Sequence, residues 1–64
     1  MAESELELAE RCVAEQKARI VNQYTLIASL RGARAPTAEA ERLLDSMHEL
    51  LLTMQDLVVR LKPT

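Results

Sequence analysis

Few side chains in this sequence have the chemistry that catalysis or metal binding requires. Cys12 and His48 are the only cysteine and the only histidine. The nucleophile nearest to His48 is Ser46, and side chains two residues apart on a helix point in different directions. One cysteine and one histidine also fall short of the four ligands of a structural zinc site. We therefore expect no catalytic residues, no metal and no cofactor.

Size and charge exclude further classes of function. A chain of 64 residues with a single glycine has no glycine-rich loop for phosphate and little room for a concave pocket. Its 8 basic and 10 acidic residues are dispersed and give a net charge of −2, so no overall charge attracts nucleic acid or anionic lipid. No apolar run approaches the roughly 18 residues of a membrane span. Residues 1–5 are acidic where a signal peptide would be basic, so we expect a cytoplasmic protein.

The elements that must position the remaining side chains are predicted to be helices. Hydrophobic residues make up 48% of the chain and are almost all aliphatic, with Tyr24 the single aromatic residue. Such a composition favours helices over strands. The pattern breaks at one place, residues 32–37, which include the only glycine and one of the two prolines.

Capping signals place the ends of two helices. Ser4 followed by Glu7 fits a capping box, and Gly32 suits the left-handed residue just past a helix end. Thr37 is the natural N-cap of the second helix, and Pro63 ends it. We predict helices over about 5–31 and 38–61, joined by a loop of residues 32–37 within one domain of residues 1–64. Because the loop is short, the helices must pack antiparallel, which makes the fold an all-α hairpin.

Both predicted helices carry apolar residues at alternating spacings of three and four, as in the seam of a coiled coil. The first seam occupies positions 6, 9, 13, 16, 20, 23, 27 and 30, and the second occupies 40, 43, 47, 50, 54, 57 and 61. Leu44, Leu51 and Val58 form another stripe beside the second seam, which Leu52 and Val59 widen. One neighbouring helix cannot cover this arc, so we expect the stripe to face a partner.

The small size of the chain leads to the same expectation. A chain this short buries only about 60% of the surface of its unfolded state, and neither a disulfide nor a metal reinforces it. We expect a homodimer that forms a four-helix bundle, or a complex with another helical protein. We expect neither membrane nor nucleic acid as a partner. The predicted interface comprises Leu44, Leu51, Val58, Leu52, Val59, Tyr24, Gln16 and Gln23.

Four features have competing interpretations. Gln16 and Gln23 interrupt the apolar seam, where a buried amide pair would set register and partner choice, whereas amides at the seam edge would reach water. Cys12 lies beside the seam and is either a redox-sensitive thiol or a small hydrophobic residue, and the second interpretation is preferred. Tyr24 borders the seam, where its ring can pack while its hydroxyl reaches solvent or a partner. His48 is expected on the polar surface.

A run of residues along most of the chain resembles short, uncharacterised bacterial helical-hairpin proteins. The residues that carry it are Ala9-Glu10-Arg11, Arg19-Ile20, Gln23, Leu26-Ile27, Leu30, Thr37, Ala40 and Leu43-Leu44. In architecture the chain is also similar to the plasmid copy-number regulators of the Rop type, hairpins that dimerise into a four-helix bundle and bind paired RNA loops. This second resemblance implies an RNA-binding regulator, with Arg11, Lys17 and Arg19 as the contacting residues. Because Glu15 interrupts these cations, a protein interaction or self-association module is the preferred function.

Overall fold

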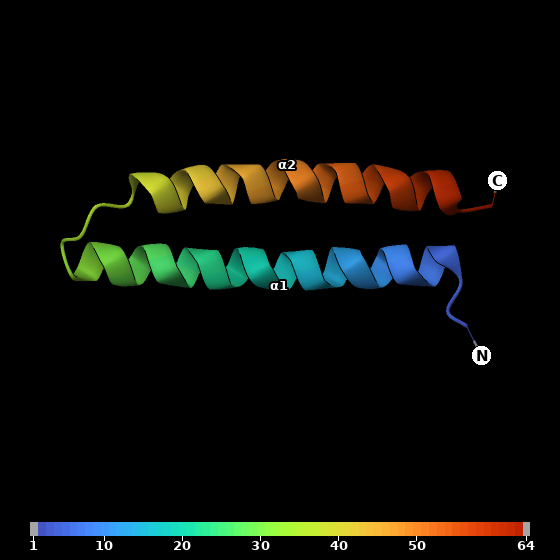
Figure 1. Cartoon of the computed structure of the whole chain (residues 1–64), viewed down its shortest axis with the longest axis horizontal. Helices are drawn as coiled ribbons and strands as arrows, with labels where there is room; N and C mark the ends of the chain where they lie inside the picture. The colour runs from blue at the N-terminus through green and yellow to red at the C-terminus, as the bar shows by residue number, and fades with distance from the viewer. Residues whose placement is uncertain (1, 64) are drawn as a thin grey trace.

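A computed structural model describes residues 2–63, which form two helices, α1 (Glu5–Gly32) and α2 (Ala38–Leu61). The helices lie side by side and antiparallel, so the loop lies at one end of the molecule and both termini at the other (Figure 1). The predicted all-helical hairpin is thus confirmed, with helix bounds within one residue of those expected. Within residues 2–63, neither helix is long and apolar enough to cross a membrane.

Ser4 and Thr37 are the N-cap residues of α1 and α2, as predicted, but only Ser4 makes a capping bond with its side chain. The hydroxyl oxygen of Ser4 accepts a hydrogen bond of 3.1 Å from the backbone N–H of Glu7, which is one of the two bonds of a capping box. Thr37 makes no side-chain capping bond. Its hydroxyl instead donates to a carboxylate oxygen of Glu41 at 3.3 Å, and Arg31 pairs with the other carboxylate oxygen at 2.6 Å. The Glu41 carboxylate of α2 therefore contacts both Arg31 of α1 and Thr37, and so links the two ends of the loop.

The left-handed residue after α1 is Arg34, and the prediction that Gly32 has this conformation is wrong. Arg34 has φ 58°, whereas no glycine has a positive φ. Ala35 N–H donates to the carbonyl of Leu30 at 2.8 Å, and Arg34 N–H donates to that of Arg31 at 3.0 Å. These two bonds form a Schellman motif, which requires a left-handed residue two positions beyond Gly32. Glycine thus occupies a helical position here, where its flexibility is unfavourable.

The substitution Gly32→Ala tests this assignment by the sign of its effect. A Cβ atom at Gly32 would meet no other atom within 4 Å. We expect the free energy of unfolding to rise by about 0.5 to 1 kcal/mol, because alanine loses less backbone entropy in a helix. Thermal melts at one fixed protein concentration measure the change. A decrease in stability would instead place Gly32 in the left-handed conformation that the sequence predicted.

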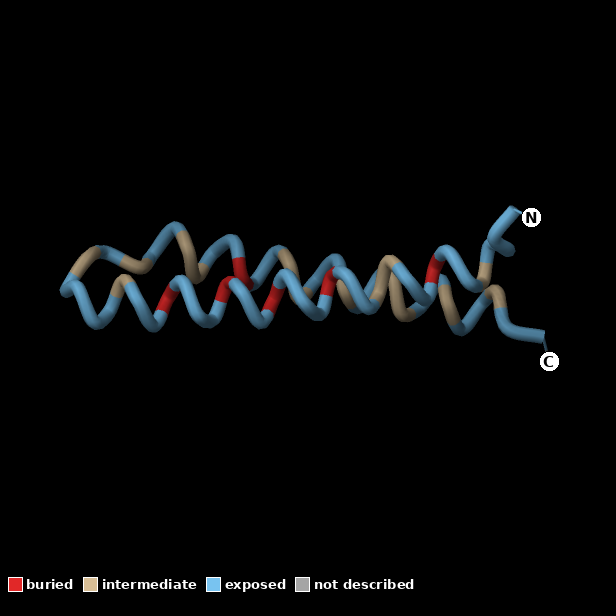
Figure 2. The backbone as a smooth tube through the Cα atoms, turned by 90° about the horizontal axis from the view of Figure 1, so that it is seen from below, coloured by how far each residue is buried: buried red, intermediate tan, exposed pale blue. Residues whose placement is uncertain are grey.

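The core lies between the facing sides of the helices (Figure 2). Ile20 and Ile27 of α1 form a buried cluster with Leu44 of α2, and partly buried residues of α2 pack around it: Ala40, Met47 and Leu51. Every buried residue of α1 falls on the predicted seam: Ala9, Gln16, Ile20, Gln23 and Ile27. The seam prediction for the first helix is therefore confirmed.

The seam prediction for the second helix is wrong, because the neighbouring stripe of apolar residues faces α1 in its place. Leu43, Leu50 and Leu57, assigned to the seam, are 50%, 46% and 49% exposed. Leu44 is buried and Leu51 and Val58 are half-buried, so the stripe expected to face a partner faces α1 instead. Both stripes alternate with the same central positions, 40, 47, 54 and 61, at spacings of three and four. The periodicity of α2 therefore fits either register, and only its placement against α1 selects one.

Candidate interaction surface

The leucines that the fold leaves uncovered on α2 lie in one line. Leu43, Leu50 and Leu57 repeat every seven residues, which is two turns of a helix, so they share one side of α2. Each keeps about half of its surface in water. Full burial of a leucine contributes about 1.5 to 3 kcal/mol, so each of these residues leaves roughly 1 kcal/mol unrealised in an isolated hairpin.

Near the termini this line borders an apolar groove of about 380 Å³ between the helices. The groove is open because Ala9 on the seam and Cys12 beside it are small and leave space that larger side chains would fill. Leu8 of α1 forms its other edge, opposite Leu57. The remaining lining residues are Glu5, Met54 and Leu61, so the walls are apolar apart from one carboxylate.

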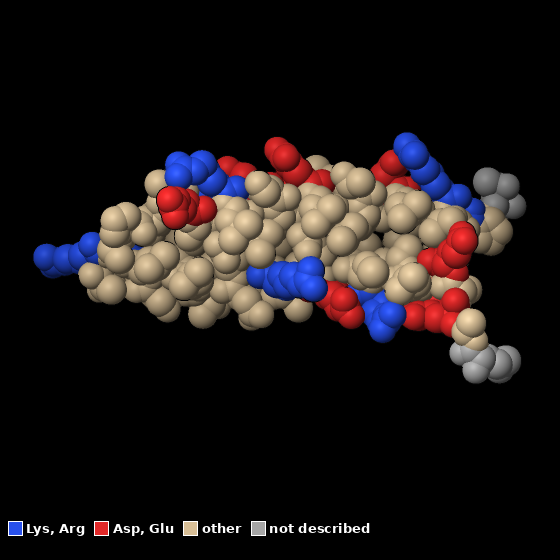
Figure 3. All heavy atoms as spheres, viewed as in Figure 1, with Lys and Arg blue, Asp and Glu red and all other residues tan. Residues whose placement is uncertain are grey.

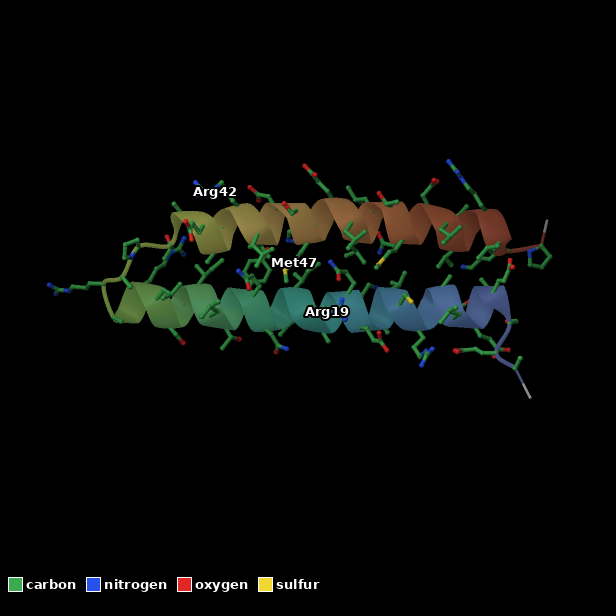
Figure 4. All side chains as sticks on the ribbon, viewed as in Figure 1. Arg19, Arg42 and Met47 are labelled. Atoms are coloured by element: carbon green, nitrogen blue, oxygen red, sulfur yellow. The ribbon has the colours of Figure 1, made fainter. Side chains whose placement is uncertain are left out.

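The apolar surface continues along α1 toward the loop. Leu26 lies fourteen residues after Cys12, which places it on the same side of the helix, and it is half-exposed like Leu8. We call this surface the leucine face and define it by its five exposed leucines: Leu8, Leu26, Leu43, Leu50 and Leu57. Arg19 lies between Cys12 and Leu26 in the same seven-residue repeat and marks this side (Figure 4). Viewed from there, uncharged atoms cover both helices and charged side chains lie mostly along the edges (Figure 3).

The opposite side of the hairpin is more polar. A smaller groove of about 240 Å³ is lined there by Glu10, Val13, Gln55, Val58, Val59 and Lys62. Two predicted interface residues of α2, Leu52 and Val59, are exposed on this side and not on the leucine face. The sequence-based interface therefore combined residues that the fold places on different sides: Leu44 and Leu51 inside, Leu52 and Val59 outside.

Tyr24 and His48 form a pair on this polar side that the sequence analysis missed. The hydroxyl of Tyr24 lies 3.1 Å from Nε2 of His48, and the ring centroids are 6.0 Å apart in an edge-to-face arrangement. Tyr24 is half-exposed, as expected, but its hydroxyl contacts the same chain. His48 is half-buried on this side, beside the Tyr24 ring. The register between the helices, which periodicity left open, was the information needed to find this contact.

The seam glutamines are buried within the hairpin. Gln16 and Gln23 are 2% and 6% exposed, so the interpretation in which their amides reach water is wrong. Nε2 of Gln16 donates to the carbonyl of Met47 at 3.0 Å, and Nε2 of Gln23 donates to that of Ala40 at 2.8 Å. These carbonyls are two turns apart on α2, as the amides are on α1. A shift of one helix along the other would break both bonds and leave two buried amides unpaired, so we expect the pair to favour this register.

The other candidate residues are not assembled into a site. Cys12 is half-buried and unpaired, and residues 2–63 contain no group of three metal-ligating side chains. Arg11 pairs with Glu3 at 3.0 Å. Lys17 and Arg19 are two positions apart on α1 and hence about 160° apart around its axis, so with Arg11 they form no common cationic surface.

Comparisons of the chain with family models, with curated proteins and with solved structures find no match.

Proposed function

We propose that this chain is a non-catalytic protein interaction module, which places its leucine face against another helical surface and completes a four-helix bundle. The observation that carries the proposal is the line of half-exposed Leu43, Leu50 and Leu57 beside the apolar groove. A contiguous apolar surface with a polar rim is typical of a docking site. The partner is a second copy of this chain or another amphipathic helical protein.

The leucine face is favoured over the opposite side for a physical reason. Its leucines lie on both helices and flank a groove whose lining is apolar apart from Glu5. On the opposite side Val59 lies among Glu10, Gln55 and Lys62, whose desolvation would offset much of the gain from burial. Interface cores are depleted in charged residues, and no charged residue interrupts the seven-residue line of Leu43, Leu50 and Leu57.

Paired substitutions test the proposal on the same helix. We expect Leu50→Glu to abolish complex formation, because it introduces an unpaired charge at the centre of the face. Leu52→Glu makes the same chemical change at a residue that is 67% exposed and should leave complexes intact. Sedimentation detects self-association, and capture from a cell lysate detects other partners.

Salt dependence separates this proposal from RNA binding. An apolar helix interface should persist as salt is raised, whereas phosphate contacts weaken steeply. If both variants formed the same complexes as the wild type, the leucine face would not be an interaction surface. If complexes contained RNA and dissociated at high salt, the regulator of the Rop type would replace this proposal.

A further inference from the structure

The spacing of leucines on the α2 side of the leucine face is symmetric. Leu43 and Leu57 lie seven residues before and after Leu50. If a second copy of α2 is packed antiparallel against this side with Leu50 at the centre, Leu43 of each copy meets Leu57 of the other. Leu50 then meets its own counterpart, so every leucine of the line gains a leucine contact.

The α1 side of the face is symmetric as well, and here the pattern includes charge. Leu8 and Leu26 lie nine residues before and after Lys17, whereas Glu15 and Arg19 lie two residues before and after it. An antiparallel second copy of α1 would place leucine against leucine at both ends and each carboxylate against a guanidinium in the middle. Among residues 2–63, neither Glu15 nor Arg19 takes part in an ion pair, so both charges are available.

The midpoints of the two symmetric patterns, Lys17 on α1 and Leu50 on α2, lie at nearly the same height along the hairpin. Lys17 follows Gln16, whose amide contacts the carbonyl of Met47, and Leu50 lies slightly less than one turn beyond Met47. Helical side chains lean toward the N-terminus of their own helix. Because the helices are antiparallel, the side chains around Lys17 on α1 and that of Leu50 on α2 lean toward each other along the hairpin axis. A single twofold axis can therefore relate both helices to those of a second copy.

We infer that the partner of the leucine face is a second copy of this chain, packed about a twofold axis near Leu50 with the two loops at opposite ends. The inference rests on the proposed function, since it names the occupant of the same surface. An isologous contact needs a self-complementary patch, which the two symmetric patterns provide. The molecule measures 49 × 22 × 13 Å, so its broad face is about 1,000 Å² in area. Two such faces would bury at most roughly 2,000 Å² in total, so an overlap of about two-thirds already reaches the range of standard stable interfaces.

Disulfide trapping tests the position of the axis. In a Cys12→Ala background, we expect Leu50→Cys to form a covalent dimer under mild oxidation on the order of tenfold faster than Leu52→Cys, because only residues at the axis meet their own counterparts. Leu52 is the matched control, since it is more exposed than Leu50 on the same helix. Leu43→Cys alone should form little covalent dimer, whereas a mixture of Leu43→Cys and Leu57→Cys should form the mixed dimer.

Charge exchange gives a second measurement that does not depend on the leucines. Glu15→Arg alone and Arg19→Glu alone should each associate more weakly than the wild type, because like charges then face each other. Their equimolar mixture should recover wild-type association, since each copy complements the other. Restoration by mixing cannot arise within one chain, so it isolates the contact between copies.

Two results would overturn the inference and leave the proposed function in place. A wild type that sediments as a monomer at micromolar concentration would leave a different helical protein as the partner. Faster trapping through Leu52→Cys than through Leu50→Cys would place the contact between copies on the opposite side. If Leu50→Glu and Leu52→Glu abolished complex formation equally, the effect would not depend on the leucine face, and the proposed function itself would be contradicted.

Discussion

Leu44→Glu is expected to unfold the hairpin. Leu44 is 9% exposed and packs with Ile20 and Ile27, so the substitution removes the centre of the core and places a carboxylate with no partner there. Such changes cost about 3 to 5 kcal/mol, and a single core in a chain this small rarely supplies more than about 3 to 5 kcal/mol of stability. Circular dichroism should show loss of most of the helical signal and of the cooperative melt.

Two further substitutions, Leu52→Glu and Leu43→Glu, show whether the effect is specific to the buried position of Leu44. Leu52→Glu, at a residue that remains largely in water, should change the stability by no more than about 0.5 kcal/mol. If Leu44→Glu kept its helices while Leu43→Glu lost them, the register of α2 would be the one that periodicity predicted, with Leu43 facing α1.

The double substitution Gln16→Leu with Gln23→Leu is expected to raise the melting temperature by roughly 10 °C. Each change replaces a buried amide by an apolar side chain, which gains about 1.5 to 3 kcal/mol from burial and loses about 0.5 to 1.5 kcal/mol of hydrogen bonding. The carbonyls of Met47 and Ala40 keep their helical hydrogen bonds, so no buried acceptor is left unpaired. A net gain of about 1 kcal/mol per site accounts for the shift in a domain of this size.

The same variant should lose specificity while it gains stability. Without the two amides, a shift of α1 along α2 no longer breaks a hydrogen bond, so alternative registers and oligomers become accessible. Native mass spectrometry beside the thermal melt measures both effects. Gln55→Leu is the matched control, because the same change at a half-buried residue outside the seam should neither broaden the oligomer distribution nor raise the melting temperature comparably. A single unchanged oligomer would restrict the glutamines to a packing role.

The glutamines also show how far the candidate site could be predicted. Their spacing on the seam was visible in the sequence, and so was the possibility that a buried pair sets register. Their acceptors were not, because the carbonyls of Met47 and Ala40 come close only when α2 is placed against α1. The Tyr24–His48 contact was missed for the same reason, since its two residues are 24 positions apart and share no local pattern.

Local patterns in the sequence determined the helices, their bounds and the buried side of α1. On α1 the seam is flanked mostly by charged or small side chains, so one apolar stripe stands out and its burial follows. On α2 two leucine stripes flank the same central residues, and each satisfies the coiled-coil spacing equally well. Only the tertiary structure decided that Leu44 faces inward and Leu43 outward, because the approach of α1 and the two glutamine bonds depend on contacts between residues far apart in the chain.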